Sequence, residues 1–464
     1  MHKLYERVII VKVFKTPRIM RKGSDVLSKE FGKYVRGGAP ETEKFDMNAP
    51  AIKQKMYAMP IVWGFSYIRK LLHFGKLNKV RMKGVKPPYI LLCNHNAFFD
   101  FYIMSAAISP NRGIFPAAVD DYIGREWGLR RLGAIPKRKY TADISLLRQC
   151  RKALKENQIF GIYAEARYSL CGVTEVIPDA VGQLVKHQGV PVVTLTCRGH
   201  HIYDPFWGDH RKRWVHPIQA DMVLAYTPEE LKKTSVEEIG EKLKNLLYND
   251  DFRWQSENHV KVSYKKRAEG LHKVLYQCPH CMTEFKMNSK NDKVFCEHCG
   301  KSWTLNYYGE LEADDGETEF KFATDWYKWE REQVKKEVLD GTYRFESQVD
   351  VNDLPNSKGF VHMGRGTLVH DMTGFHLKGT RDYDGEPFEM NIDAAGQYAV
   401  HVEYNYRFGN HRDCIDLNTL EDTWYVFPEH SEFSVTKVSL ATEEIFNEIW
   451  RQRNEKRKAA KAEE

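Results

Sequence analysis

The stretch 89-YILLCNHNAFFDFYIM-104 joins a continuous apolar run to a helical pattern, and an Asn-His pair stands at the junction. The run from Tyr89 to Cys93 carries no charged residue, which is typical of a strand buried on both faces of a sheet. Asp100 follows His95 by five residues, early in the expected helix. An aspartate placed there can turn back and bond the imidazole Nδ1, which leaves Nε2 free as a base. We therefore expect a His95–Asp100 pair where a buried strand ends.

Short apolar runs alternate with helical stretches along the chain after this junction. Strands are expected at GIFPAAV (113–119), IFGIYAEA (159–166) and GVPVVTLTCRG (189–199), with helices between them at DISLLRQCRKALKENQ (143–158) and AVGQLVKHQ (180–188). The alternation predicts an α/β fold, a mixed and largely parallel sheet flanked by helices. Ligands of such sheets bind beyond the carboxyl ends of the strands.

The His-x4-Asp pattern is weak evidence when it stands alone. The chain contains two further examples, His216 with Asp221 and His411 with Asp416. Only His95 follows an apolar strand and opens a helix, so context separates it from the other two. The alternative interpretation of His95 is a histidine that caps a turn.

Four sequence blocks, in order along the chain, resemble those of a known protein family. They are NHNAFFD (94–100), LGAIPKRK (132–139), YAEARYS (163–169) and GVPVVTL (189–195). Together they resemble the glycerolipid acyltransferase family, typified by lysophosphatidate and glycerol-3-phosphate acyltransferases. The resemblance covers roughly residues 50–220, under half of the chain.

The resemblance implies direct acyl transfer, from acyl-CoA or acyl-carrier protein to a hydroxyl of a lysophospholipid such as 1-acylglycerol 3-phosphate. His95 would remove the hydroxyl proton, and Asp100 would steady the imidazolium. The substrate-binding residues that the resemblance implies are Asn94, Arg138, Glu165 and Arg167. Guanidinium groups suit an acceptor phosphate because they bind it bidentately.

The third and fourth blocks depart from the family pattern. Ala164 and Ala166 replace a proline and a glycine, Tyr168 stands where an arginine is usual, and Thr194 replaces a proline. Arg167 would then supply the guanidinium from one position earlier. The departures leave two alternatives open. One is an acyltransferase for a non-phosphate lyso-lipid, and the other is a degenerate core that acts as a binding or adaptor protein through its C-terminal half.

Two Cys-x-x-Cys pairs, Cys278 with Cys281 and Cys296 with Cys299, follow the acyltransferase-like blocks. Two such knuckles can present four thiolates to one tetrahedral Zn²⁺, and four thiolates leave no open coordination position. We therefore expect a structural zinc ribbon. It would either clip two domains together, which we favour, or bind a partner.

The pattern along the chain predicts four regions. They are a polar segment at 1–50, an acyltransferase domain at 51–260, a zinc ribbon at 270–310, and a β-rich domain with a closing C-terminal helix at 320–455, which faintly resembles a pleckstrin-homology-like barrel. Within the second region, an amphipathic helix at about 56–76 carries the apolar stretch MYAMPIVWGFSYI (56–68). Such a helix either docks on a membrane interface or packs on the protein's own core.

Composition and charge indicate the kind of partner and the cellular compartment. The net charge is +7 and the pI is about 8.7, which favours anionic partners. An anionic membrane surface fits better than nucleic acid, because the four sequence blocks resemble those of enzymes that act on lipids. The N-terminus shows no secretory pattern, and no uncharged apolar run reaches the length of a membrane span. We therefore expect a cytoplasmic protein, peripheral on the inner face of the membrane, with reduced cysteines.

Overall fold

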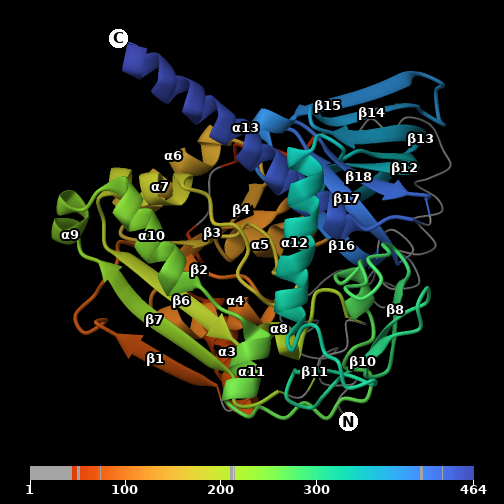
Figure 1. The fold of residues 1–464 in the computed structure, drawn as a ribbon. Coiled ribbons are helices and arrows are strands. Elements are labelled where there is room, and N and C mark those ends of the chain that lie inside the picture. Colours follow the sequence, from red (N-terminus) through yellow and green to blue (C-terminus); the bar gives the residue numbers. More distant parts are fainter. Residues whose placement is uncertain are drawn as a thin grey trace, which may run out of the picture.

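The computed structural model describes residues 44–49, 53–73, 75–208, 213, 215–407, 411–430 and 432–463. Nearly all of the predicted polar segment 1–50 therefore lies outside the described residues. Figure 1 shows three sheets, with the N-terminal half of the chain around the first and the C-terminal half around the third.

The first sheet has seven strands in the order β1-β7-β6-β2-β5-β3-β4. Neighbouring strands run parallel except β6 and β7, so the predicted mixed, largely parallel sheet is confirmed. β2 lies at its centre and is buried along its whole length. The strands are β1 (Lys76–Val80), β2 (Tyr89–Cys93), β3 (Gly113–Ala118), β4 (Ala134–Lys137), β5 (Ile159–Tyr163), β6 (Val192–Arg198) and β7 (Gln219–Tyr226).

Helices cover both faces of this sheet, as the alternating side chains of β2 require. Leu91 and Cys93 belong to one core cluster, and Ile90 and Leu92 to another. The first cluster includes α4 (Phe99–Ile108), on which α3 (Met59–Leu72) packs, and the second includes α6 (Ile144–Lys155), α7 (Ala180–Gln188) and α10 (Val236–Leu247). Shorter helices are η2 (Val119–Tyr122), α5 (Glu126–Arg131), α8 (His200–Tyr203), α9 (Pro228–Lys233) and α11 (Asp251–Glu257).

The amphipathic helix predicted at about 56–76 is α3. Proline at its start and two basic residues in its last turn fit its ends. Among the described helices, none combines the length and the apolar composition that a membrane crossing requires.

The cysteine-rich unit is a small antiparallel sheet in the order β11-β10-β9-β8. Its strands are β8 (Met287–Lys290), β9 (Lys293–Cys296), β10 (Ser302–Leu305) and β11 (Leu311–Ala313), and η3 (Leu271–Lys273) precedes them. The second Cys-x-x-Cys pair starts at the end of β9 and the first precedes β8.

The third sheet is antiparallel throughout, in the order β15-β14-β13-β12-β18-β17-β16. Its strands are β12 (Phe345–Asn356), β13 (Gly359–Asp371), β14 (Gly374–Thr380), β15 (Pro387–Asp393), β16 (His401–Tyr406), β17 (Arg412–Asn418) and β18 (Thr423–Pro428), with η4 (Ala394–Gly396) before β16. A β-rich region with a closing helix is thus present, and its pleckstrin-homology-like identity stays a prediction.

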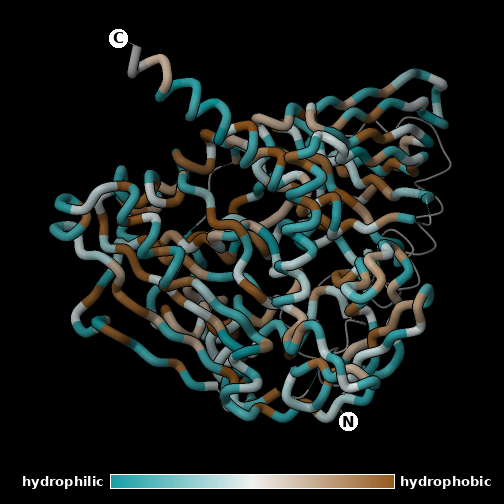
Figure 2. The backbone as a smooth tube through the Cα atoms, in the orientation of Figure 1, coloured by the Kyte–Doolittle hydropathy of each residue, from teal (hydrophilic) through white to brown (hydrophobic). Residues whose placement is uncertain are grey.

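Two long helices, α12 (Ala323–Leu339) and α13 (Val435–Glu463), pack against each other beside the third sheet. The start of α13 is buried, and its residues 451–460 are exposed. Figure 2 shows this protruding end as mostly hydrophilic, in contrast to the brown strands of the sheets.

One hydrophobic core runs through all three parts of the chain. It includes Leu170 and Trp207 from the first part, Trp303 from the ribbon, Trp326 of α12 and Tyr404 of β16. The indole rings of Trp303 and Trp326 meet edge to face at 4.8 Å. The regions that the sequence separates therefore share their interior, and the cysteine-rich unit contributes to the same core as the other two.

Replacing Trp326 by alanine tests this shared core. The side chain is fully buried, and its Nε1 donates to the carbonyl of Gln277 at 2.9 Å. We expect Trp326→Ala to lower the free energy of unfolding by about 3–5 kcal/mol and to shift one common transition in chemical denaturation. Trp127, which is 58% exposed, is the control, and Trp127→Ala should cost less than about 1 kcal/mol. Two separate transitions, only one of them shifted, would contradict the shared core.

Candidate active site and metal centre

His95 and Asp100 meet beyond the carboxyl end of β2. His95 lies two residues after the strand, and Asp100 lies in the first turn of α4. The imidazole Nδ1 is 3.1 Å from Asp100 Oδ2, and no described residue bonds His95 Nε2. The side chain of His95 is 16% exposed and that of Asp100 is 1% exposed. The pair thus consists of an accessible imidazole and a buried carboxylate, which is the geometry of a general base and its orienting group.

Asp100 is held as an anion by an unusually complete set of donors. Oδ2 accepts the backbone N–H groups of Asn96 at 2.6 Å and Ala97 at 3.0 Å, besides His95. Oδ1 accepts from Nδ1 of His200 at 2.5 Å. Burial alone would raise the pKa of Asp100, but the bonds from His200 and His95 outweigh it and lower the pKa to about 2. The carboxylate is therefore charged at any physiological pH.

The side chain of Glu165 holds the backbone at His95 in place. Its Oε1 accepts the backbone N–H of His95 at 2.8 Å, and its Oε2 accepts the backbone N–H of Glu175 at 2.6 Å. Burial raises the pKa of Glu165 to about 8, although both backbone bonds oppose that shift. Both oxygens are engaged by backbone groups, so the geometry gives Glu165 a scaffolding position and leaves its predicted contact with substrate without support.

Asn94 has a similar scaffolding position. Its side chain accepts the N–H of Cys197 at 2.7 Å and donates to the carbonyl of the same residue at 2.9 Å. The residue is fully buried and joins the ends of β2 and β6. It fixes the loop that carries His95.

Two tyrosines lie against the His95 ring. The ring of Tyr163 stacks on it with centroids 3.8 Å apart, and that of Tyr168 lies at 4.1 Å. Tyr168 is the residue that replaces the usual arginine of the third block. The Tyr163 ring is stacked and the Tyr168 ring is tilted by 38°, and together the two contacts restrict the rotation of the imidazole.

The structure places Arg138 and Arg167 away from solvent. Arg138 is 1% exposed and donates to Thr423 Oγ1 at 2.6 Å. Arg167 is 2% exposed and pairs with Glu175 at 2.8 Å and Glu443 at 2.6 Å. The sequence predicts that both guanidinium groups hold an acceptor phosphate, whereas in this structure both are bonded to protein groups. Neither arginine lines the cavity described below, and Arg138 Nε has no hydrogen-bond partner among the described residues. Their contact with substrate therefore stays a prediction.

A cavity of about 460 Å³ lies between the first sheet's loops and β16. Tyr168 both lines the cavity and contacts His95, so the cavity reaches the surroundings of the imidazole. Its remaining lining residues are Asn96, Ala97, Phe98, Asp204, Pro205 and Phe206 on one side and Glu403, Tyr404, Asn405, Tyr406 and Arg407 on the other. The third sheet therefore builds one wall of the candidate site.

The wall contributed by β16 is irregular. The pairing of β16 with β17 shifts register between Glu403 and Tyr406, and Asn405 has a φ of 50°. Such a bulge redirects side chains, and asparagine tolerates the left-handed conformation better than most residues. Lys273 donates to the Asn405 side chain at 2.9 Å, which holds the bulge in place.

Residues 72–198 match the family model described as Acyltransferase. The matched segment contains His95, Asp100, Arg138, Glu165 and Arg167. A crystal structure of the 1-acyl-sn-glycerophosphate (LPA) acyltransferase PlsC from Thermotoga maritima aligns with 41% of this chain and 77% of its own, at 18% identity and a TM-score of 0.32. The comparison with curated proteins finds no match. The chain thus contains an acyltransferase-like segment, which is the part that carries the His95–Asp100 pair.

Sequence reasoning missed three parts of this site. His200 was signalled only by a Gly-His-His run at the end of a strand, which resembles no block of the acyltransferase-like segment. Tyr163 and Tyr168 stood inside a recognised block without an assigned role. The wall from β16 begins at His401, 306 residues after His95, and nothing local marks it.

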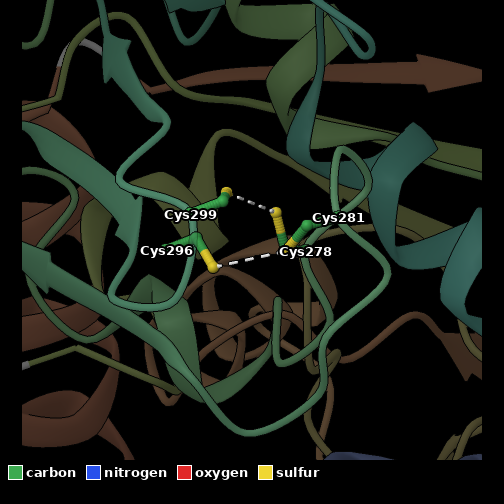
Figure 3. Close-up of side chains that lie close together, drawn as sticks. All are labelled: Cys278, Cys281, Cys296 and Cys299. Atoms are coloured by element: carbon green, nitrogen blue, oxygen red, sulfur yellow. Dashed lines mark hydrogen bonds between the residues drawn. The ribbon is translucent and has the colours of Figure 1, made fainter.

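The four cysteines of the two knuckles converge, as Figure 3 shows. Sγ of Cys278 lies 3.8 Å from that of Cys299, and Sγ of Cys281 lies 3.7 Å from that of Cys296. A tetrahedral Zn²⁺ with Zn–S bonds of about 2.3 Å requires S···S separations of about 3.8 Å. The donor set therefore fits a four-coordinate zinc ion, whose role would be structural because no coordination position stays open.

Zinc removal tests this centre. We expect the purified protein to hold one zinc ion per chain, measured by metal analysis. Cys296→Ser should lose it and lower the free energy of unfolding by a sizeable part of the about 10–16 kcal/mol with which zinc-finger peptides bind zinc. His280→Ala is the matched control, because His280 lies inside a knuckle with its side chain 53% exposed and outside the thiolate set. Full metal retention by Cys296→Ser would contradict the assignment.

Proposed function

We propose that this chain is an O-acyltransferase that moves a fatty acyl group from a thioester to a hydroxyl of a lyso-lipid. The observation that carries the proposal is the accessible His95, tied through Nδ1 to a buried, ionised Asp100 beside a cavity. The match of residues 72–198 to the Acyltransferase model supports it.

The chemistry assigns one role to each member of the pair. Nε2 of His95 takes the proton of the acceptor hydroxyl as its oxygen attacks the thioester carbonyl. The C–S bond then breaks, and the imidazolium returns the proton to the leaving thiolate of coenzyme A or acyl-carrier protein. Asp100 keeps Nδ1 protonated and stabilises the imidazolium between these steps. Much of the acceleration comes from holding the hydroxyl against the thioester.

The acceptor that the sequence predicts is 1-acylglycerol 3-phosphate, in phospholipid biosynthesis. The cavity is large enough to take a headgroup, and Arg407 is a cation in its lining. Under this proposal the phosphate would bind on the side of the cavity that Arg407 lines.

A second candidate is a non-phosphate lyso-lipid acceptor. The burial of Arg138 and Arg167 favours it, because these are the groups that the family resemblance assigns to a phosphate. Two acidic residues, Asp204 and Glu403, also line the cavity, and aromatic rings make up much of the rest. Carboxylates and amides suit hydroxyl-rich headgroups better than phosphates. A binding or adaptor role without chemistry is the outcome if no acceptor is acylated.

Docking on an anionic membrane surface is part of the proposal. The end of α3 exposes Tyr67, Ile68, Leu71 and Leu72 by 46–74%, next to Arg69 and Lys70. Four large apolar side chains on one short helix exceed the single exposed residues that are ordinary on a soluble surface. We propose a peripheral location on the cytoplasmic face.

The test of catalysis is mass spectrometry of products from purified protein, acyl-CoA or acyl-carrier protein, and a panel of lyso-lipids with and without a phosphate monoester. We expect one acceptor class to be acylated, and His95→Ala to lower the rate by at least about 100-fold because the base is lost. The panel separates the two candidate acceptors in the same measurement.

The control for folding is His411→Ala, which removes the histidine of another His-x4-Asp pattern outside the site and should keep full activity. Product formation by His95→Ala at the wild-type rate would refute the mechanism. The absence of product with every donor and acceptor would refute the enzyme proposal and favour the adaptor role.

The docking surface is tested by flotation with vesicles that contain an anionic phospholipid. We expect the double variant Ile68→Gln/Leu71→Gln to bind at least about tenfold more weakly, because two apolar side chains no longer enter the bilayer interface. Glutamine keeps the helix propensity. The matched control is Ile144→Gln/Leu147→Gln on α6, where the side chains are 66% and 43% exposed. Equal loss of binding in both double variants would contradict a site on α3.

A further inference from the structure

A second imidazole shares the carboxylate of the candidate catalytic pair. His200 opens α8, just after β6, and its Nδ1 lies 2.5 Å from Asp100 Oδ1. His95 uses the other oxygen, Oδ2, at 3.1 Å. The three side chains therefore form a His95–Asp100–His200 array in which each carboxylate oxygen faces one imidazole.

The surroundings of His200 decide which of its nitrogens carries a proton. The residue is fully buried, and Nε2 has no hydrogen-bond partner. A proton on Nε2 would therefore be a buried donor without an acceptor, which costs free energy. Asp100 is ionised and only accepts, so Nδ1 carries the hydrogen. His200 thus acts as a neutral donor to Asp100.

The backbone around His200 is fixed by a further carboxylate. Asp251 accepts the N–H of Gly199 at 2.7 Å and that of His201 at 2.8 Å, one on each side of His200. Gly199 has a φ of 81°, and a Cβ there would lie 2.6 Å from the Trp254 ring. Both features fix the backbone from which the His200 ring reaches Asp100.

We propose that His200 is a positioning residue for the acyl transfer described above. It holds the Asp100 carboxylate in the orientation that His95 requires, and it draws part of the carboxylate charge away from His95. The inference rests on the proposed function, because its effect on rate is transmitted through His95.

A metal ion is the alternative reason for such a cluster, since ligand atoms of Asp100, Cys197 and His200 lie within 4.8 Å of one another. The oxygens of Asp100 already accept four N–H groups. Burial raises the pKa of the Cys197 thiol well above its usual value, whereas a metal needs the thiolate. The hydrogen-bonded array accounts for these contacts without an ion.

Other titratable groups surround the array and bear on its pH dependence. Asp100 faces Cys93 and Cys197 on the strands, Tyr163 and Tyr168 beside His95, and Glu165 behind it. Burial raises the pKa of all five, so the thiols and phenols stay neutral near pH 7. On the other side, His200 faces His73 and Asp251. Asp121 also faces His95, and burial raises the pKa of its carboxyl, while His201 faces Asp100, and burial lowers the pKa of its imidazole. Because all these groups stay the same in every His200 variant, a difference in the acid limb of the pH–rate profile between those variants reports on the array.

The test compares three substitutions of His200 in the full-length protein. His200→Phe keeps an aromatic ring but removes the N–H donor. His200→Asn places an amide N–H near the position of Nδ1, whereas His200→Gln places one near the position of Nε2. We expect His200→Phe to lower kcat by about 10- to 100-fold with little change in KM for the acceptor. Its acid limb should move to higher pH, because more carboxylate charge then stabilises the His95 imidazolium.

His200→Asn should recover more kcat than His200→Gln, and this pair keeps the test informative even where His200→Phe unfolds. His201→Phe is the control for losing a buried neighbouring imidazole, and its acid limb should stay in place. Two results would overturn the proposal. One is an equal kcat for His200→Asn and His200→Gln, and the other is an acid limb that stays in place in all three His200 variants.

Proton NMR separates failure of this inference from failure of the proposed function. The array predicts two far-downfield imidazole N–H resonances, one from His95 and one from His200, and His200→Phe should remove one of them without any substrate present. If both resonances are present but no acyl transfer occurs, the proposed enzyme activity is refuted and the His95–Asp100–His200 array stands. A spectrum without the His200 resonance would refute the array itself.

Discussion

The arrangement of the two halves of this protein depends on one buried cation, the guanidinium of Arg167. It pairs with Glu175 in the acyltransferase-like segment and with Glu443 of α13, and it donates to the carbonyl of Val400 just before β16. Burial alone would lower its pKa, but the two carboxylates raise it well above the usual value. Arg331 of α12 lies 2.7 Å from Glu443 and 3.9 Å from Glu175, so the two carboxylates and two guanidinium groups form one cluster that joins the halves. The C-terminal half must therefore be in place for the third block to hold its conformation.

This constraint carries over to the candidate site. The third block supplies Glu165, which bonds the backbone of His95, and Tyr168, which lies against its ring. The same block is tied to α13 through Arg167, and β16 forms the opposite wall of the cavity. Under the proposed function the acyl-transfer chemistry would come from the acyltransferase-like segment, whereas the shape of the cavity is set jointly by that segment and the C-terminal sheet.

The sequence predicted best where partners lie close together along the chain. His95 and Asp100 are five residues apart, and each Cys-x-x-Cys pair is a single turn. It predicted less well where a partner is remote. Arg138 bonds a residue 285 positions away, and Arg167 pairs with one 276 positions away. A local pattern gives no information on such contacts, so the bonds of both arginines to these remote protein groups were not predicted.

The sequence by itself determined the largely parallel α/β sheet, the junction of β2 with α4 and the cluster of four cysteines, because strand and helix periodicity and short-range spacing are properties of neighbouring residues. Only the tertiary structure decided that His200 shares Asp100, that one core unites the three sheets, and that β16 lines the cavity next to Tyr168, which contacts His95. These contacts depend on how segments far apart in the chain pack, and burial and charge compensation in that packing select which polar side chains face the cavity and which stay inside the protein.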